Sequence, residues 1–91
     1  PIYLRQHPVV ADAAVVGVPS ATWGESPAAY VVPRAGIAID AAALADWLNA
    51  RVGKTQRVVA LEFVDELPRS AIGKVLKREL RDLYIRHHPE P

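Results

Sequence analysis

The segment Val9–Val18, VVADAAVVGV, constrains the fold more than any other part of the chain. Its residues are mostly small, apolar and often β-branched, and they do not alternate between an apolar and a polar side. Such a run predicts a strand that is covered on both faces, because a strand with one wet face would alternate. We expect this strand to end at Pro19, and the chain must supply covering layers on two sides.

Two further strands are predicted. The segment Pro27–Pro33, PAAYVVP, is bounded by prolines and follows the short, turn-forming link SATWGES. Two strands joined by so short a link are expected to pair antiparallel. A third strand is predicted over Val58–Val64, VVALEFV, and Pro68 breaks the chain soon after it.

A helix is predicted between the second and third strands. Asp40 can cap its start, and it is expected to run to about Val52, with Gly53 at its end. Leu44, Trp47, Leu48 and Val52 recur on one face of this helix. The opening segment Ile2–Gln6 is predicted to form the last turns of another helix.

The last helix is predicted to begin between Ser70 and Lys74. Its apolar residues recur at helical spacing and form one stripe, comprising Leu76, Leu80, Leu83 and Tyr84. Four basic residues fall on the opposite side, namely Lys74, Lys77, Arg78 and Arg81. From this pattern alone, a solvated basic face is the ordinary interpretation.

The order of elements predicts an α+β domain over residues 1–86, with a three-stranded sheet and flanking helices, followed by a tail over 87–91. The composition is that of a globular domain, with 51% hydrophobic and 23% charged residues. The chain has no methionine and opens on PIYLRQHP, which resembles the end of a longer element. We interpret the chain as a domain cut from a longer protein, with removal of a starting methionine as the alternative.

Charge and residue usage argue against several functional classes. A net charge of +1 is unlike the large basic excess of a nucleic-acid-binding domain. The apolar runs are too short for a transmembrane segment, and the N-terminus has no signal pattern. The absence of cysteine excludes disulfides and fits a cytoplasmic protein. The three histidines do not cluster with carboxylates at metal-ligand spacing, so we expect no metal site.

The pair Gly73–Lys74 is the most unusual local feature. At the start of a helix, a lysine would sit at the partially positive end of the helix dipole, where an acidic residue is normally favoured. A glycine allows an unusual backbone angle, and the first turn of a helix offers unpaired N–H groups. Together these features suit an anion supplied from outside the chain. They do not form a P-loop, which needs a glycine-rich loop of defined spacing.

Three separated blocks of the chain resemble one family. PRSAIGKVLKREL resembles the C-terminal signature of the AMP-forming adenylating enzymes, which include acyl-CoA synthetases, adenylation domains of peptide synthetases and luciferases. HPVVADAAVVGVPSATWGESPAAYVVPR and LEFVDELPR are also similar to that family's small domain. The resemblance covers roughly residues 4–84, with the blocks in the family's order and spacing.

The resemblance implies a mobile lid that swings over a large N-terminal domain. Lys74 would be the catalytic lysine that helps to form the acyl-AMP, and Pro68, Arg69 and Gly73 would belong to its motif. The partners implied are the N-terminal domain, ATP with Mg²⁺, a carboxylic acid and CoA. This domain alone is expected to be inactive. An exposed lysine in such a lid would also be open to acylation, which would remove its charge.

The resemblance also implies a second orientation, in which the lid admits CoA. Trp23 would contact the adenine of CoA, with packing on the sheet as the alternative, and Gly24 would let the pantetheine arm pass. The sequence departs from the family at Val59, where a proline is expected, and at neighbouring positions that can be basic. Lys54 and Arg57 are the predicted substitutes for those phosphate contacts.

The form GKVLKRELR is more similar to acyl-CoA ligases than to peptide synthetases. The sequence therefore predicts the C-terminal domain of an acyl-CoA synthetase. One alternative is an adenylation domain that loads a carrier protein. Another is a non-catalytic interaction domain that uses the basic helix face. The acid is not specified, because its pocket would lie in the large domain.

Overall fold

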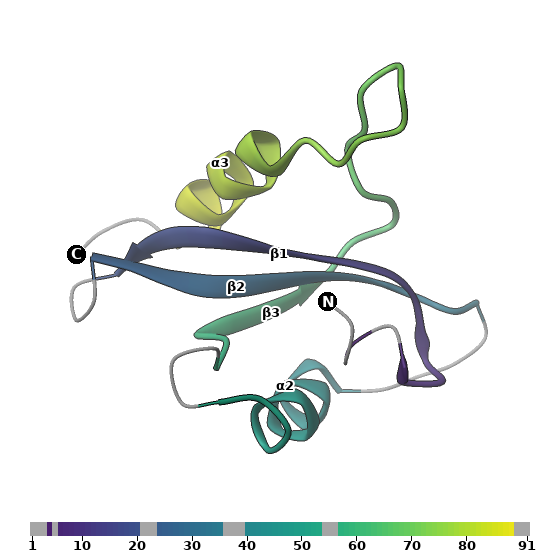
Figure 1. Cartoon of the computed structure of the whole chain (residues 1–91), viewed down its shortest axis with the longest axis vertical. Helices are drawn as coiled ribbons and strands as arrows, with labels where there is room; N and C mark the ends of the chain where they lie inside the picture. Colours follow the sequence, from purple (N-terminus) through teal and green to yellow (C-terminus); the bar gives the residue numbers. More distant parts are fainter. Residues whose placement is uncertain (1–3, 5, 21–23, 36–39, 54–56, 89–91) are drawn as a thin grey trace.

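The chain folds as an α+β domain, as predicted. The computed structural model describes residues 4, 6–20, 24–35, 40–53 and 57–88. These residues form a three-stranded sheet with helices on it (Figure 1). The elements in chain order are β1 (Val10–Ser20), β2 (Gly24–Pro33), α2 (Ala41–Asn49), β3 (Ala60–Phe63) and α3 (Lys77–His87).

The sheet has the order β1-β2-β3 and mixes two kinds of pairing. β1 and β2 are antiparallel, which confirms the prediction from their short link. β2 and β3 are parallel, with Ala28–Val31 opposite Ala60–Phe63. A parallel pair needs a crossover connection, and the segment that contains α2 supplies it. The pairing of the third strand was not predicted from the sequence.

Both faces of the sheet are covered, which confirms the interpretation of the apolar first strand. α2 lies on one face and α3 on the other (Figure 1). Alternate residues of β1 enter the two cores, since Ala13 belongs to the core under α2 whereas Ala14 and Val16 belong to the core under α3. The core under α3 is completed by Val18, Ala28, Tyr30, Leu67 and Leu80.

The second strand ends at Pro33, as predicted, but Pro19 and Pro27 do not bound the strands as the sequence suggested. β1 continues through Pro19, which lies opposite Glu25, and β2 begins at Gly24 and includes Pro27. Each proline lies where a missing N–H is tolerated: β1 is an edge strand, and Pro27 precedes the residues of β2 that pair with β3. The β hairpin is therefore longer than predicted.

α2 has the predicted cap and the predicted buried face. The Asp40 carboxylate accepts a hydrogen bond from the Ala43 N–H at 3.3 Å. Leu44 and Leu48 are buried, while Trp47 and Val52 pack at the edge of the same core. The helix ends at Asn49, three residues before the predicted end, and the Asn49 side-chain oxygen accepts a hydrogen bond from the Val58 N–H at 2.9 Å.

The chain ends differ from the prediction in one respect. Leu4 and Gln6 are helical, and Leu4 is fully buried, whereas the rest of the predicted helix 2–6 lies outside the described residues. α3 continues through His87, so its last residue falls in the segment predicted as a tail. No helix of the described segments is long and apolar enough to cross a membrane.

Candidate functional site

Residues 69–75, which carry the Gly–Lys pair, form a small hairpin that we call the Lys74 hairpin. Arg69 and Val75 make an isolated antiparallel bridge. The Ser70 N–H donates to the Lys74 carbonyl at 2.9 Å, and the Gly73 N–H donates to the Ser70 carbonyl at 2.9 Å. This is the pattern of a three-residue hairpin loop, and it projects away from the sheet (Figure 1).

Gly73 provides the backbone conformation that closes this loop. Its φ of 84° lies in the left-handed region that a three-residue hairpin requires at this position. A Cβ atom on Gly73 would meet nothing within 4 Å, so the conformation and not a lack of space favours glycine here. The prediction of an unusual backbone angle at Gly73 is therefore confirmed.

The predicted position of Lys74 at the start of the last helix is wrong. α3 begins at Lys77, with Leu76 as its N-cap residue. Val75 pairs with Arg69, and the Leu76 N–H donates to the Pro68 carbonyl at 2.8 Å, so the chain is held in a hairpin before the helix starts. Lys74 lies on the exposed part of that hairpin, so the argument from the helix dipole does not apply to it.

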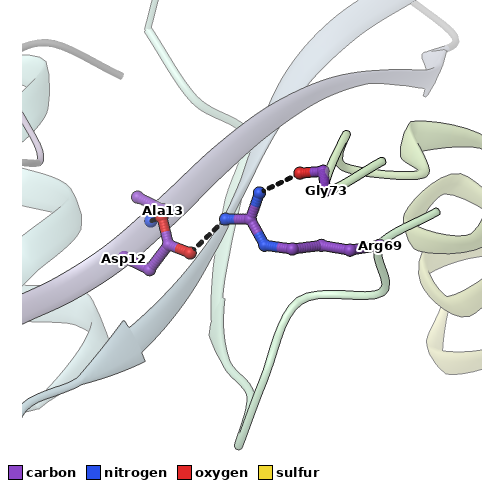
Figure 2. Close-up of polar contacts among 4 residues, drawn as sticks. All are labelled: Asp12, Ala13, Arg69 and Gly73. Atoms are coloured by element: carbon purple, nitrogen blue, oxygen red, sulfur yellow. Dashed lines mark hydrogen bonds and ion pairs between the residues drawn. The ribbon is translucent and has the colours of Figure 1, made fainter. Parts of the chain in front are cut away.

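The Arg69 side chain links this hairpin to the sheet. Its Nη1 donates to the Gly73 carbonyl at 2.7 Å, and its Nη2 donates to the carboxylate of Asp12 on β1 (Figure 2). The structure thus brings three of the predicted motif residues together, with the Pro68 carbonyl at the base, Arg69 across the loop and Gly73 next to Lys74.

The residues predicted to bind CoA lie at the other end of the sheet, where the structure describes them. Gly24 begins β2 and Arg57 precedes β3, and because these strands are parallel, both residues lie at the strands' amino ends. Both are exposed, and Gly24 has a φ of 79° with open space around it. Trp23 and Lys54 lie outside the described residues.

The residues predicted to form a solvated basic face are all exposed, namely Lys74, Lys77, Arg78 and Arg81, although Arg81 also contacts the sheet. Arg81 Nε donates to the Gly17 carbonyl on β1 at 2.8 Å, so this residue ties α3 to the sheet. Lys77 and Arg78 are exposed at the start of the helix.

Sequence reasoning missed one cluster of ionisable residues. His87 Nδ1 lies 2.8 Å from one Glu62 oxygen, and His88 Nε2 lies 3.2 Å from the other. Burial, with Glu62 and Tyr84 nearby, raises the pKa of Tyr30 to about 12. Glu62 lies on β3, whereas His87 ends α3 and His88 is its C-cap residue, so spacing along the chain could not reveal these contacts. Within the described segments, no group of three or more acidic or histidine residues is suited to a metal ion.

Comparison with known proteins identifies the family. Residues 3–74 match the family described as the AMP-binding enzyme C-terminal domain. This match covers most of the chain, and it includes β1, β2, α2, β3 and Lys74 itself. The chain therefore belongs to the AMP-binding enzyme C-terminal domain family.

Relatives and solved structures agree with this assignment. The chain is 44% identical over 80 residues to 2-succinylbenzoate–CoA ligase of Geobacillus kaustophilus, which covers 88% of this chain and 16% of the relative. It is 40% identical over 81 residues to the fatty acid–[acyl-carrier-protein] ligase ScoC of Streptomyces coeruleorubidus, and the match covers 89% of this chain and 16% of that relative. The structure of apo MatB from Rhodopseudomonas palustris superimposes with a TM-score of 0.83 at 40% identity. The match covers 89% of this chain and 16% of the MatB chain. The chain thus spans about one sixth of the length of these proteins.

Proposed function

We propose that this chain is the lid domain of an AMP-forming acyl-CoA synthetase and that Lys74 assists formation of the acyl-AMP. The observation that carries this proposal is the Lys74 hairpin, which holds an exposed lysine on a projecting, hydrogen-bonded loop. In a family that includes ligases for CoA and for an acyl-carrier protein, a lysine in this position suits delivery to an active site in another domain.

The chemistry explains the choice of a cation. A carboxylate that attacks the α-phosphate of ATP brings two anions together, and negative charge builds up as pyrophosphate leaves. A positive charge placed between them reduces the repulsion and stabilises the developing charge. Lysine suits a lid because its compact charge sits on a long, flexible stem.

The arrangement of the sheet supports two working orientations. The Lys74 hairpin follows the carboxyl end of β3, whereas Gly24 and Arg57 lie at the amino ends of β2 and β3. Lys74, proposed for adenylation, and Gly24 and Arg57, proposed for CoA binding, therefore lie at opposite ends of the parallel strands. A rotation of the domain would bring one end and then the other to the active site.

The remaining components of the reaction belong to the proposed whole enzyme. ATP with Mg²⁺ and the carboxylic acid would be bound mainly by an N-terminal domain. CoA would enter at the amino ends of β2 and β3, where Gly24 lies. Trp23, Gly24, Lys54 and Arg57 remain the predicted CoA contacts. A cytoplasmic location also remains a prediction.

A carrier protein is the second candidate acceptor. The relative ScoC is named as a ligase for an acyl-carrier protein, and its identity to this chain is 40%, close to that of the CoA ligase cited above. The surface around the exposed Gly24 would accept a carrier-bound pantetheine arm as well as free CoA, because the pantetheine arm is chemically the same in both.

The test uses the full-length enzyme with a panel of carboxylic acids. We expect acid-dependent exchange of pyrophosphate into ATP, followed by a thioester when free CoA is added. Exchange without reaction with CoA, but with transfer to a carrier protein, would favour the second candidate. A full-length protein that shows no exchange with any acid of an aliphatic and aromatic panel would contradict the proposed function.

A further inference from the structure

We infer that the Arg69–Asp12 pair is a positioning device that sets the direction of Lys74 for adenylation, an inference that rests on the proposed function. The Arg69 guanidinium bridges the Gly73 carbonyl and the Asp12 carboxylate (Figure 2). One planar side chain thus connects the peptide unit directly before Lys74 to the edge strand of the sheet.

The contact with Gly73 fixes the part of the loop that most needs fixing. The Gly73 carbonyl belongs to the peptide plane that leads into Lys74, and the orientation of that plane sets where the lysine side chain starts. The N–H of this peptide unit is held by one weak contact, since the Lys74 N–H donates to Ser70 Oγ at 3.3 Å, and the adjoining glycine has the greatest backbone freedom of any residue. The hydrogen bond of 2.7 Å from Arg69 Nη1 restricts this plane.

The contact with Asp12 makes the loop move with the domain. Asp12 Oδ1 accepts the Ala13 N–H at 2.9 Å, so the carboxylate is itself held by the backbone of β1. Arg69 and Asp12 are 57 residues apart in the sequence. A rotation of the sheet would therefore be transmitted through this pair to the base of Lys74.

An irregularity in β1 places Asp12 on the correct face. The register shifts between Val10, which lies opposite Pro33, and Asp12, which lies opposite Val32. Without this bulge, Val10 and Asp12 would point to the same face, since they are two residues apart. With it, Val10 packs in the core under α2 while Asp12 reaches Arg69, and such re-aiming of a side chain is typical of bulges.

Arginine is needed because the contacts with Gly73 and Asp12 both come from one rigid, planar guanidinium group. Lysine carries a single point charge and cannot hold a carbonyl and a carboxylate in a fixed plane at once. Arg69→Lys therefore keeps the charge near Asp12 but weakens the two-point link. This makes the substitution a more discriminating test than removal of the side chain.

The experiment compares two half-reactions in the full-length enzyme. We expect Arg69→Ala and Arg69→Lys to lower the maximal rate of acid-dependent pyrophosphate exchange by about 10-fold to 100-fold, since a small misplacement of a catalytic group has an effect of this size. The KM for the acid and the rate of thioester formation from preformed acyl-AMP should stay near wild type. Asp12→Asn should have a smaller effect, because the link to Gly73 remains.

Arg86→Ala is the matched control, because Arg86 is an exposed arginine near the far end of α3. Exchange within twofold of wild type in both Arg69 variants would overturn the inference. An equal loss in both half-reactions would also overturn it, since it indicates general damage to the domain. A wild-type enzyme without any exchange would instead contradict the proposed function, so the two failures can be distinguished.

Discussion

The sheet and the Lys74 hairpin are held together in different ways. The sheet buries side chains on two faces, and residues such as Val18, Tyr30 and Leu80 are almost fully inaccessible. In the hairpin, the loop residues 71–74 are exposed, and Ile72 at the tip has 88% of its surface accessible. The shape of the Lys74 hairpin depends on backbone hydrogen bonds, on Gly73 and on the Arg69 side chain.

This difference indicates that separate parts of the 91-residue chain determine its stability and its proposed role in the reaction. Apolar burial contributes most of the folding free energy, so changes in the cores should alter stability. A hairpin that buries little can be shaped for a partner domain at little cost to the fold. Changes there should alter the reaction while the domain stays folded.

The largest expected effect on stability is in the core under α3. Leu80 is 1% exposed and packs against β1 and β2. Leu80→Ala should lower the free energy of unfolding by about 2–5 kcal/mol, because it leaves a cavity between the helix and the sheet. Urea unfolding of the 91-residue chain measures this change. The control is Arg86→Ala on the exposed side of the same helix, and an equally small change in both would contradict the packing argument.

The second prediction concerns alkaline pH and Tyr30. Its pKa is raised from 10.0 to about 12 in the folded chain. Above pH 10 the unfolded chain releases this proton while the folded chain retains it, so stability falls as the pH rises through the folded pKa. A shift of about two pKa units corresponds to roughly 3 kcal/mol of stability, which is fully present below pH 10 and is lost as the pH rises to about 12.

Tyr30→Phe provides the matching control, since it removes the ionisable hydroxyl and keeps the ring in the core. We expect its stability to change much less than that of wild type between pH 10 and 12, as followed by urea unfolding at each pH. Parallel curves for the two proteins would show that burial of Tyr30 does not govern the alkaline response.

The smallest effect on stability is expected in the hairpin. Gly73 has a φ of 84°, and an alanine forced into this region is strained by about 1–2 kcal/mol. We expect Gly73→Ala to rearrange the loop locally, with about a tenfold loss of pyrophosphate exchange in the full-length enzyme and little change in the unfolding midpoint.

Gly53→Ala is the control for this substitution, because Gly53 does not have a positive φ and has open space for a Cβ atom. If Gly73→Ala unfolded the domain as severely as Leu80→Ala, the separation between the core and the hairpin would be wrong.

Most of the fold could be predicted from the sequence, because its signals are local. The apolar run at Val9–Val18 required cover on two sides, and the structure provides α2 and α3 there. The spacing of Leu44 and Leu48 predicted the buried face of α2. Asp40 marked its start. The parallel pairing of β3 could not be predicted in this way, since it depends on where the crossover returns the chain.

The local structure of the candidate site was harder to predict than the fold. The motif singled out Lys74 as a candidate, but the helix was predicted to start at or before it, although the apolar stripe begins only at Leu76, which is the N-cap residue of α3. The hairpin depends on the bridge between Arg69 and Val75 and on the distant contact with Asp12. Contacts across 57 residues leave no periodic pattern in a single sequence. The link from His87 to Glu62 was missed for the same reason.

Lys74→Ala in the full-length enzyme tests the central claim most directly. The measurement compares acid-dependent pyrophosphate exchange with thioester formation from preformed acyl-AMP, and Lys77→Ala serves as a control with an exposed lysine three residues away. We predict that exchange falls by about 10²–10³-fold in Lys74→Ala, while thioester formation and the Lys77→Ala control stay near wild type. Wild-type rates for both half-reactions in Lys74→Ala would contradict the proposed role of this lysine.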